Sequence, residues 1–121
     1  MTDCLFCRIV AGELPAEIVR EAEHTVAFRD IAPQAPVHVL IVPREHLGSA
    51  AEIEERHGPM LAETARVATE LAQAEGIAER GWRLITNVGP DAGQAVFHLH
   101  FHLLGGRPLG RLVQGSPEGV R

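Results

Sequence analysis

The stretch HLHFHLL, residues 98–104, alternates histidines with apolar residues and constrains the fold of this chain more tightly than any other part of it. Successive side chains of a β-strand point to opposite faces of the sheet, with a rise of about 3.3 Å per residue. The pattern therefore predicts a strand with His98, His100 and His102 on one face. Its other face is apolar and has to be covered by a helix: Phe97, Leu99, Phe101 and Leu103.

Three histidines in a row allow three interpretations: a metal site, a catalytic site, or a polar sheet face that tolerates histidine. The outer two lie about 13 Å apart on a regular strand, whereas Zn–N bonds measure only about 2.0–2.1 Å. One ion therefore does not easily collect all three, and we expect the rings to have separate roles. The apolar run VHVLIVP contains a further histidine, His38, which favours a functional cluster over a solvated face.

The rest of the pattern predicts an α+β domain with a largely antiparallel sheet. A short helix is expected over residues 4–12, a hairpin over 16–30, and strands over 37–43, 82–88 and 94–104. We expect residues 1–107 to form a single domain and residues 108–121, which contain several glycines and prolines, to form a C-terminal arm.

The main helix is predicted over residues 58–76. Pro59 suits the first turn of a helix, and Gly76 suits its end. Between them, apolar residues recur at helical spacing: Leu61, Ala65, Ala68, Leu71 and Ala72.

The composition excludes several functions. A net charge of −5 argues against a nucleic-acid partner, which requires a basic surface. The absence of lysine and tyrosine excludes Schiff-base chemistry, a Walker-type lysine and a tyrosine nucleophile. No run approaches the roughly 18 apolar residues of a membrane span, and MTDCLFCRIV at the start has no secretory pattern. We therefore expect a cytoplasmic protein without a membrane partner.

Two short motifs point toward ligands without identifying them. The glycine-rich GPDAG, residues 89–93, precedes the histidines and is able to turn backbone N–H groups toward an anion, although such a loop by itself is usually only a turn. Cys4 and Cys7 form a Cys-x₂-Cys pair. In a reducing cytoplasm, two metal ligands or two small buried residues are better interpretations of this pair than a disulfide.

HLHFHLL matches the histidine triad motif, His-φ-His-φ-His-φ-φ with φ apolar, and the agreement extends through FRDIAPQAPVHVLIVPREH, ITNVGPDAGQAV and LGGR. On these residues the chain resembles the histidine triad (HIT) family, and within it the histidine triad nucleotide-binding (Hint) branch. The resemblance implies the HIT fold, a five-stranded antiparallel sheet with two helices that dimerises into a continuous ten-stranded sheet. It also implies hydrolysis of purine nucleoside phosphoramidates, above all those of adenosine, to a nucleoside monophosphate and an amine, without an organic cofactor.

The same resemblance implies a role for each residue of the site. His100 is the nucleophile that takes up the nucleotidyl group, and His102 contacts the phosphate and passes a proton to the leaving group. His38 stands behind them as a hydrogen-bond partner, with a satisfied buried histidine as the competing interpretation. The implied nucleotide-binding set is Asp30 for the ribose, Ile31 for the base or sugar, Asn87 for the leaving-group side, and the amides of Gly93, Gln94 and Ala95 for the α-phosphate, together with His100 and His102.

Two positions depart from the family pattern. Ala95 stands where many relatives have a serine whose hydroxyl contacts the phosphate, so we expect a weaker contact there. The tail RPLGRLVQGSPEGVR lacks the tryptophan-bearing end of some relatives, which leaves the specificity for the leaving group open.

Many bacterial members of the family hold zinc on a cysteine pair and two histidines, which here match Cys4, Cys7, His46 and His98. A structural zinc ion at these residues would tie the N-terminal helix to the histidine strand and leave His100 free. The competing interpretation is that both cysteines are small buried hydrophobic residues.

Two further functions remain open at this point. A dinucleoside polyphosphate hydrolase would use the same nucleophile, since both reactions take place at an α-phosphate. A non-catalytic nucleotide-binding regulatory module would keep the pocket without the chemistry.

Overall fold

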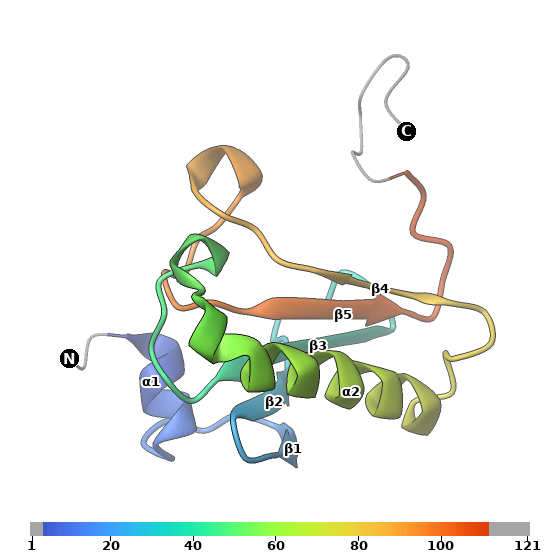
Figure 1. The fold of residues 1–121 in the computed structure, drawn as a ribbon. Helices are drawn as coiled ribbons and strands as arrows, with labels where there is room; N and C mark the ends of the chain where they lie inside the picture. The colour runs from blue at the N-terminus through green and yellow to red at the C-terminus, as the bar shows by residue number, and fades with distance from the viewer. Residues whose placement is uncertain (1–3, 112–121) are drawn as a thin grey trace.

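The computed structural model describes residues 4–111. Its elements in chain order are α1 (Leu5–Val10), β1 (Ile18–Glu21), β2 (Thr25–Arg29), β3 (Val37–Pro43), α2 (Gly58–Ala74), β4 (Trp82–Ile85) and β5 (Phe101–Gly105), with short 3₁₀ helices at Ala50–Glu52, Glu55–His57 and Pro90–Ala92. The five strands form one antiparallel sheet in the order β1-β2-β3-β5-β4 (Figure 1). The predicted α+β class, the hairpin and the main helix are confirmed.

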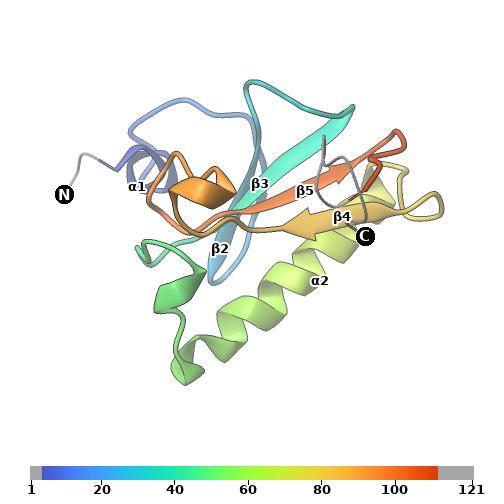
Figure 2. The ribbon, with the colours of Figure 1, turned by 90° about the horizontal axis from the view of Figure 1, so that it is seen from above.

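Strand β3 lies at the centre of the sheet, and all of its residues are buried. Val39 and Ile41 pack in the cluster beneath α2, whereas Leu40 and Val42 pack on the opposite face with Phe6 of α1. Figure 2 shows α1 and α2 on the two sides of the sheet. Because both faces of β3 are covered, its sequence is a continuous apolar run rather than an alternation.

Helix α2 buries three of the five residues predicted for its apolar stripe, Ala68, Leu71 and Ala72, whereas Leu61 and Ala65 are exposed. The residues that face the sheet are Met60, Glu63, Thr64, Val67, Ala68, Leu71 and Ala72. The helical spacing is confirmed, but the first half of the buried stripe contains the polar residues Glu63 and Thr64, so the sequence pattern placed the buried face correctly only in the second half of the helix.

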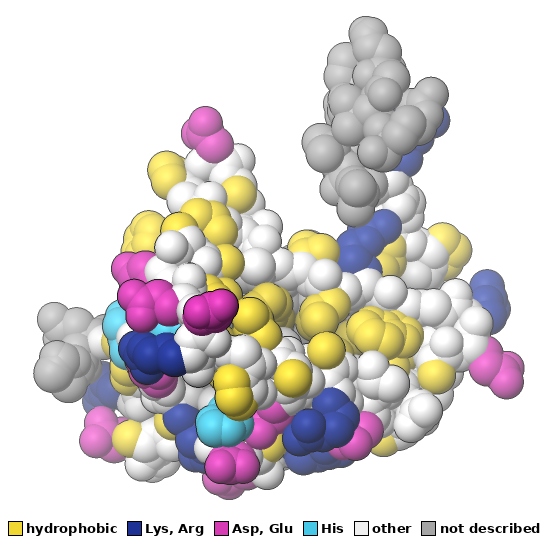
Figure 3. All heavy atoms as spheres, viewed as in Figure 1, with side chains coloured by type: hydrophobic (Ala, Val, Ile, Leu, Met, Phe, Trp, Pro, Cys, Tyr) yellow, Lys and Arg dark blue, Asp and Glu magenta, His cyan; other side chains and the backbone are white. Residues whose placement is uncertain are grey.

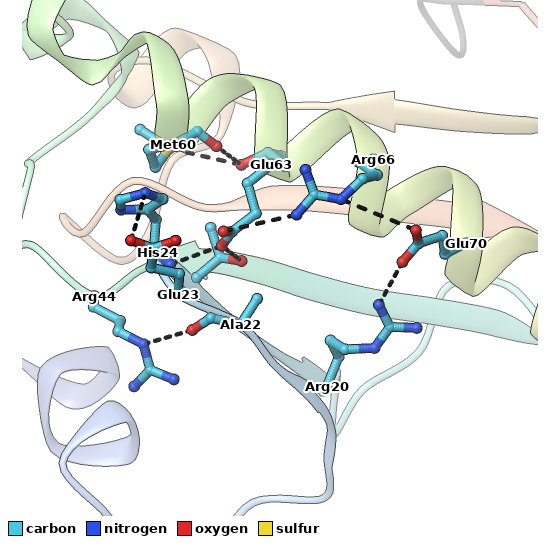
Figure 4. Close-up of polar contacts among 11 residues, drawn as sticks. Arg20, Ala22, Glu23, His24, Arg44, Met60, Glu63, Arg66 and Glu70 are labelled. Atoms are coloured by element: carbon cyan, nitrogen blue, oxygen red, sulfur yellow. Dashed lines mark hydrogen bonds and ion pairs between the residues drawn. The ribbon is translucent and has the colours of Figure 1, made fainter.

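A buried carboxylate fastens α2 to the hairpin (Figure 4). Glu63 is only 4% exposed, and its Oε2 accepts hydrogen bonds from the Thr25 hydroxyl at 2.7 Å and from the His24 amide at 2.8 Å. Burial alone would raise the pKa of Glu63, but these hydrogen bonds, with nearby positive charge, hold it below the ordinary value of 4.5. The carboxylate is therefore ionised and satisfied at neutral pH.

Strand β5 begins later than the predicted strand 94–104. Its ladder with β3 runs only from Ile41↔Phe101 to Val37↔Gly105, and residues 96–98 form a bend. Phe97, predicted on the covered face, is 62% exposed. His98 therefore does not share a regular strand face with His100 and His102, and the bend gives its ring a different environment from theirs.

The ends of the described chain are held by local contacts. Helix α1 stops before Gly12, whose φ of +78° is readily reached only without a side chain. Beyond β5, Arg107 donates to the carbonyl of Gln34 and Arg83 donates to the carbonyl of Gly110. Residues 112–121 of the predicted arm lie outside the described part of the chain. No helix within residues 4–111 is long and apolar enough to cross a membrane.

Candidate active site and metal cluster

A cavity of about 470 Å³ lies between α1, the end of β2 and the histidines at the start of β5. Its lining includes most of the residues predicted to bind a nucleotide: Asp30, Ile31, Asn87, Gly93, Ala95, His100 and His102. Gln94 and His38 do not line the cavity. The fold thus brings together segments as far apart in the sequence as Leu5 and His102.

His100 is buried, and its tautomer follows from one hydrogen bond. Its Nδ1 lies 2.7 Å from the backbone carbonyl oxygen of His98, and because a carbonyl only accepts, Nδ1 carries the proton. The neutral ring then keeps a lone pair on Nε2, which has no hydrogen-bond partner within residues 4–111. A free imidazole nitrogen of this kind is a nucleophile.

Two further contacts fix the position of His100. The Thr86 hydroxyl donates to the His100 carbonyl at 2.6 Å. The Phe6 ring packs on the imidazole in a T-shaped arrangement, at a centroid distance of 5.1 Å and an interplanar angle of 85°. His100 is thus restrained through its backbone, its Nδ1 and its ring.

A directed chain of hydrogen bonds ends at His102. The Gln34 amide donates to Nδ1 of His38 at 3.0 Å, so His38 carries its own proton on Nε2. That Nε2 lies 2.9 Å from Nδ1 of His102 and 3.4 Å from Oδ2 of Asp30. Since His102 accepts at Nδ1, its single proton is on Nε2, where it is available to a ligand.

The pKa values of His38 and His102, the two histidines of this hydrogen-bond chain, agree with neutral rings. Burial lowers the pKa of His102 to about 4, and the neighbouring His100 and His38 act in the same direction. Burial also lowers the pKa of His38, against the opposing effect of the Asp30 carboxylate. At neutral pH both rings are uncharged donors and acceptors.

The remaining wall of the cavity is largely apolar: Leu5, Phe6, Ile9, Leu14, Pro15, Ala16, Phe28 and Leu40. Ile31 lines the same cavity and is 99% exposed. A large apolar side chain left in water beside such a wall suits contact with an aromatic ligand.

The loop 89–95 is organised by Gln94. Its side chain accepts from the Gly89 amide and donates to the carbonyls of Gly48 and Val96. The amides of Gly93 and Gln94 donate to Pro90 and Gly89 within the loop. Of the three amides assigned to the phosphate from the sequence, only that of Ala95 has no partner among the described residues, so Gln94 acts here by holding the loop.

Asn87 and Asp30 offer polar atoms at the cavity. The Asn87 carboxamide makes no hydrogen bond to the described residues, which leaves its donors and acceptor free. Asp30 Oδ1 accepts from the Ala32 amide at 2.8 Å, which fixes the carboxylate at the end of β2. Asp30 Oδ2 remains beside His38.

The predicted metal ligands also converge. The ligand atoms of Cys4, Cys7, His46 and His98 all lie within 4.8 Å of one another. The Cys4 Sγ–His98 Nδ1 and Cys7 Sγ–His46 Nδ1 distances are both 3.3 Å, and the two Nδ1 atoms are 3.2 Å apart. A tetrahedral zinc site has ligand–ligand edges of about 3.3–3.8 Å, computed from Zn–N and Zn–S bond lengths. The donor set therefore fits a zinc ion.

The orientation of His98 supports the same conclusion. Its Nε2 lies 2.9 Å from the Pro43 carbonyl and donates to it, so the Nδ1 lone pair faces the two sulfurs. Burial, together with the hydrogen bond and charge of Cys4, raises the pKa of the Cys7 thiol to about 11, so an incoming metal ion has to displace a proton. The arrangement is compatible with zinc and leaves His100 out of the cluster.

Three contributors to the site were missed in the sequence. Phe6 lies between the two cysteines, Thr86 bonds the His100 carbonyl, and Gln34 contributes only its backbone amide. The helical spacing of Leu5, Phe6 and Ile9 would have indicated an apolar helix face. Nothing in the sequence distinguishes the Gln34 amide from any other.

Comparisons with known proteins agree with this geometry. The HIT domain matches residues 11–109. A purine nucleoside phosphoramidase of Escherichia coli K12 is 43% identical over 111 residues, which are 92% of this chain and 93% of that protein. A 14 kDa zinc-binding protein of Zea mays is 45% identical over 107 residues, which are 87% and 83% of the two chains.

A solved structure shows the same fold. The HIT family hydrolase of Legionella pneumophila superposes with a TM-score of 0.87 at 47% identity, covering 89% of this chain and 96% of that one. This chain belongs to the HIT family.

Proposed function

We propose that the chain is a hydrolase that cleaves purine nucleoside phosphoramidates, those of adenosine above all, to a nucleoside monophosphate and an amine. The observation that carries the proposal is the free Nε2 of His100 at the wall of the cavity, with its Nδ1–H donated to the His98 carbonyl at 2.7 Å. The similarity to a purine nucleoside phosphoramidase supports the substrate class.

In the first step, the Nε2 lone pair of His100 attacks the α-phosphorus. The bond from phosphorus to the amine nitrogen breaks, and its electron pair stays on that nitrogen, which takes a proton from Nε2 of His102. Because the neutral ring would become an imidazolate on losing its single proton, His102 takes up a second proton from solvent when the substrate binds. The anionic substrate favours this uptake, since a nearby negative charge raises the pKa of His102 from its low value in the free protein. The Ala95 amide and the Asn87 carboxamide are the free donors for the phosphate oxygens.

In the second step, water attacks the phosphorus of the nucleotidyl-histidine. The P–Nε2 bond breaks, its electron pair returns to His100, and the water proton passes to His102. Two displacements at one phosphorus replace a single slower one. Asp30 accepts from the ribose hydroxyls, and the apolar wall with Ile31 takes the base.

A zinc ion at Cys4, Cys7, His46 and His98 would supply structural cross-linking between α1 and the segments that carry the two histidines, and this set of ligands does not include His100. The similarity to a zinc-binding protein of Zea mays supports the binding of zinc. Zinc content near one ion per chain after purification without added metal is the expected result.

We also propose that two chains associate through β4. This strand is an edge of the sheet, paired within residues 4–111 only with β5, so one row of its backbone groups is open to a partner. Apolar side chains gather between this edge and α2 (Figure 3), and Leu61 on α2 is 36% exposed. Sedimentation equilibrium should give twice the chain mass.

Turnover of an adenosine phosphoramidate tests the proposed reaction, with AMP and amine as products. His100→Ala should abolish it and leave AMP binding measurable, whereas His24→Asn, a matched loss of an imidazole outside the site, should not change it. Faster turnover of a diadenosine polyphosphate would favour the alternative hydrolase, since both substrates offer the same α-phosphate. AMP binding with no turnover of either would favour a regulatory module.

A further inference from the structure

The metal cluster and the nucleotide cavity share one small helix. Cys4 and Cys7 flank Leu5 and Phe6 at α1, so a single turn carries two predicted metal ligands and two wall residues of the cavity. Ile9 of the same helix also lines the cavity. Whatever fixes the two sulfurs in space also fixes these apolar side chains.

Helix α1 needs an external restraint. It has six residues, far fewer than the roughly 12–15 at which isolated helices become even marginally stable. Phe6 supplies one anchor by packing with Phe28 and Leu40 on the sheet. The sulfurs of Cys4 and Cys7 supply the other, through His46 and His98, which belong to different segments of the chain.

His98 links the cluster to the nucleophile a second time. Its ring faces the sulfurs, while its backbone carbonyl accepts a hydrogen bond from Nδ1–H of His100 at an N···O distance of 2.7 Å. Phe6 packs edge-on against both rings, with centroid distances of 6.0 Å to His98 and 5.1 Å to His100. Displacement of α1 or of His98 therefore changes the cavity wall and the aim of Nε2 together.

We infer that metal occupancy at Cys4, Cys7, His46 and His98 controls nucleotide affinity by latching α1 against the cavity. The inference rests on the proposed function, since it requires the cavity to bind a nucleotide. Linkage makes the effect reciprocal: AMP tightens zinc binding by the same factor by which zinc tightens AMP binding. A factor on the order of ten is expected for a coupling of this kind.

His46→Asn gives the sharpest test, because His46 is an exposed residue that does not line the cavity. We expect this variant to lose zinc to a chelator and to bind AMP about tenfold more weakly under the same conditions. Its matched control, His24→Asn, should keep both zinc and the wild-type Kd for AMP. Zinc-stripped wild type should bind AMP as weakly as the stripped variant, with weakened NMR contacts between α1 and the sheet.

A reciprocal measurement uses the zinc-loaded wild type. Saturating AMP should raise the chelator concentration needed to remove zinc by about the same tenfold factor. In Phe6→Leu, which loosens the wall but keeps all four ligands, this shift should shrink.

Equal AMP affinity in loaded and stripped protein would overturn the inference and leave the proposed function intact. Global unfolding on metal removal, seen by circular dichroism, would also overturn it, since the metal would then hold the whole domain. Absence of AMP binding to the zinc-loaded wild type would instead refute the proposed function.

Discussion

Glu63→Leu should destabilise the protein far more than an ordinary surface substitution. The change removes the acceptor for the Thr25 hydroxyl, at 2.7 Å, and for the His24 amide, at 2.8 Å (Figure 4). Thr25 is 1% exposed, so its hydroxyl would be left without a hydrogen-bond acceptor from either water or the protein. Each stranded donor costs about 1–3 kcal/mol. Because His24 is only half-buried and leucine regains some apolar burial, we expect a total loss of about 2–4 kcal/mol.

Urea unfolding at a fixed free zinc concentration measures this loss, with fluorescence of Trp82, the one tryptophan, as the probe. Glu70→Leu is the matched control on the same helix. Glu70 pairs with Arg20 at 2.7 Å, but both side chains are well exposed, so its loss should cost less than about 1 kcal/mol. A double-mutant cycle with Thr25→Val should recover a coupling of about 1 kcal/mol or more.

The effect should also fade in acid. The pKa of Glu63 lies below 4.5 in the folded protein, so its stabilisation is present above that value and is lost as pH falls through the folded pKa. The difference in stability between wild type and Glu63→Leu should therefore narrow as the pH falls below 4.5. Equal destabilisation by Glu63→Leu and Glu70→Leu, or a gap independent of pH, would refute the reasoning.

Three other variants test the packing and the histidine chain. Gly105→Ala places a Cβ 2.5 Å from Cδ1 of buried Ile77, which should cost about 1–3 kcal/mol in the same urea assay, and adding Ile77→Val should recover most of it. Because the pKa of His102 falls from 6.5 to about 4 on folding, the unfolded state binds more protons between these pH values. As the pH falls from 6.5 to 4, the free energy of unfolding of wild type should decrease by up to about 3 kcal/mol more than that of His102→Gln. Parallel curves of stability against pH for the two proteins would contradict a neutral His102 ring. Thr86→Val removes the 2.6 Å bond to the His100 carbonyl and should lower kcat with little change in KM, while Thr86→Ser restores kcat; an unchanged kcat would show that this bond does not position the nucleophile.

The local patterns of apolar and polar residues predicted most of the fold because they indicate which side chains are buried. The unbroken apolar run of β3 and the hairpin before it were recognisable, since each strand pairs with its neighbour in the chain. The first half of the buried stripe of α2 was misplaced because Glu63 and Thr64 occupy it, and their burial depends on partners in the hairpin and on a helix carbonyl. Hydrogen bonds of this kind leave no period in the sequence.

In the candidate site, too, some residues were predictable from the sequence and others depend on contacts that form only in the folded protein. The histidines, Asp30 and the cysteine pair were found because their side chains carry recognisable chemistry and lie in a family pattern. The bend at residues 96–98, which separates His98 from the other two rings, was missed because alternation continues through it. The backbone amide of Gln34 and the edge of Phe6 act through geometry alone, which appears only once α1 and the β2–β3 loop are folded over the histidines.

Mass spectrometry of the enzyme during turnover tests the central claim most directly. Wild type mixed with adenosine phosphoramidate, denatured rapidly in alkali and digested should carry one adenylyl group on the peptide that contains His100, and the group should be absent from His100→Ala. An adduct on any other side chain, or full turnover by the His100→Ala variant, would contradict the account.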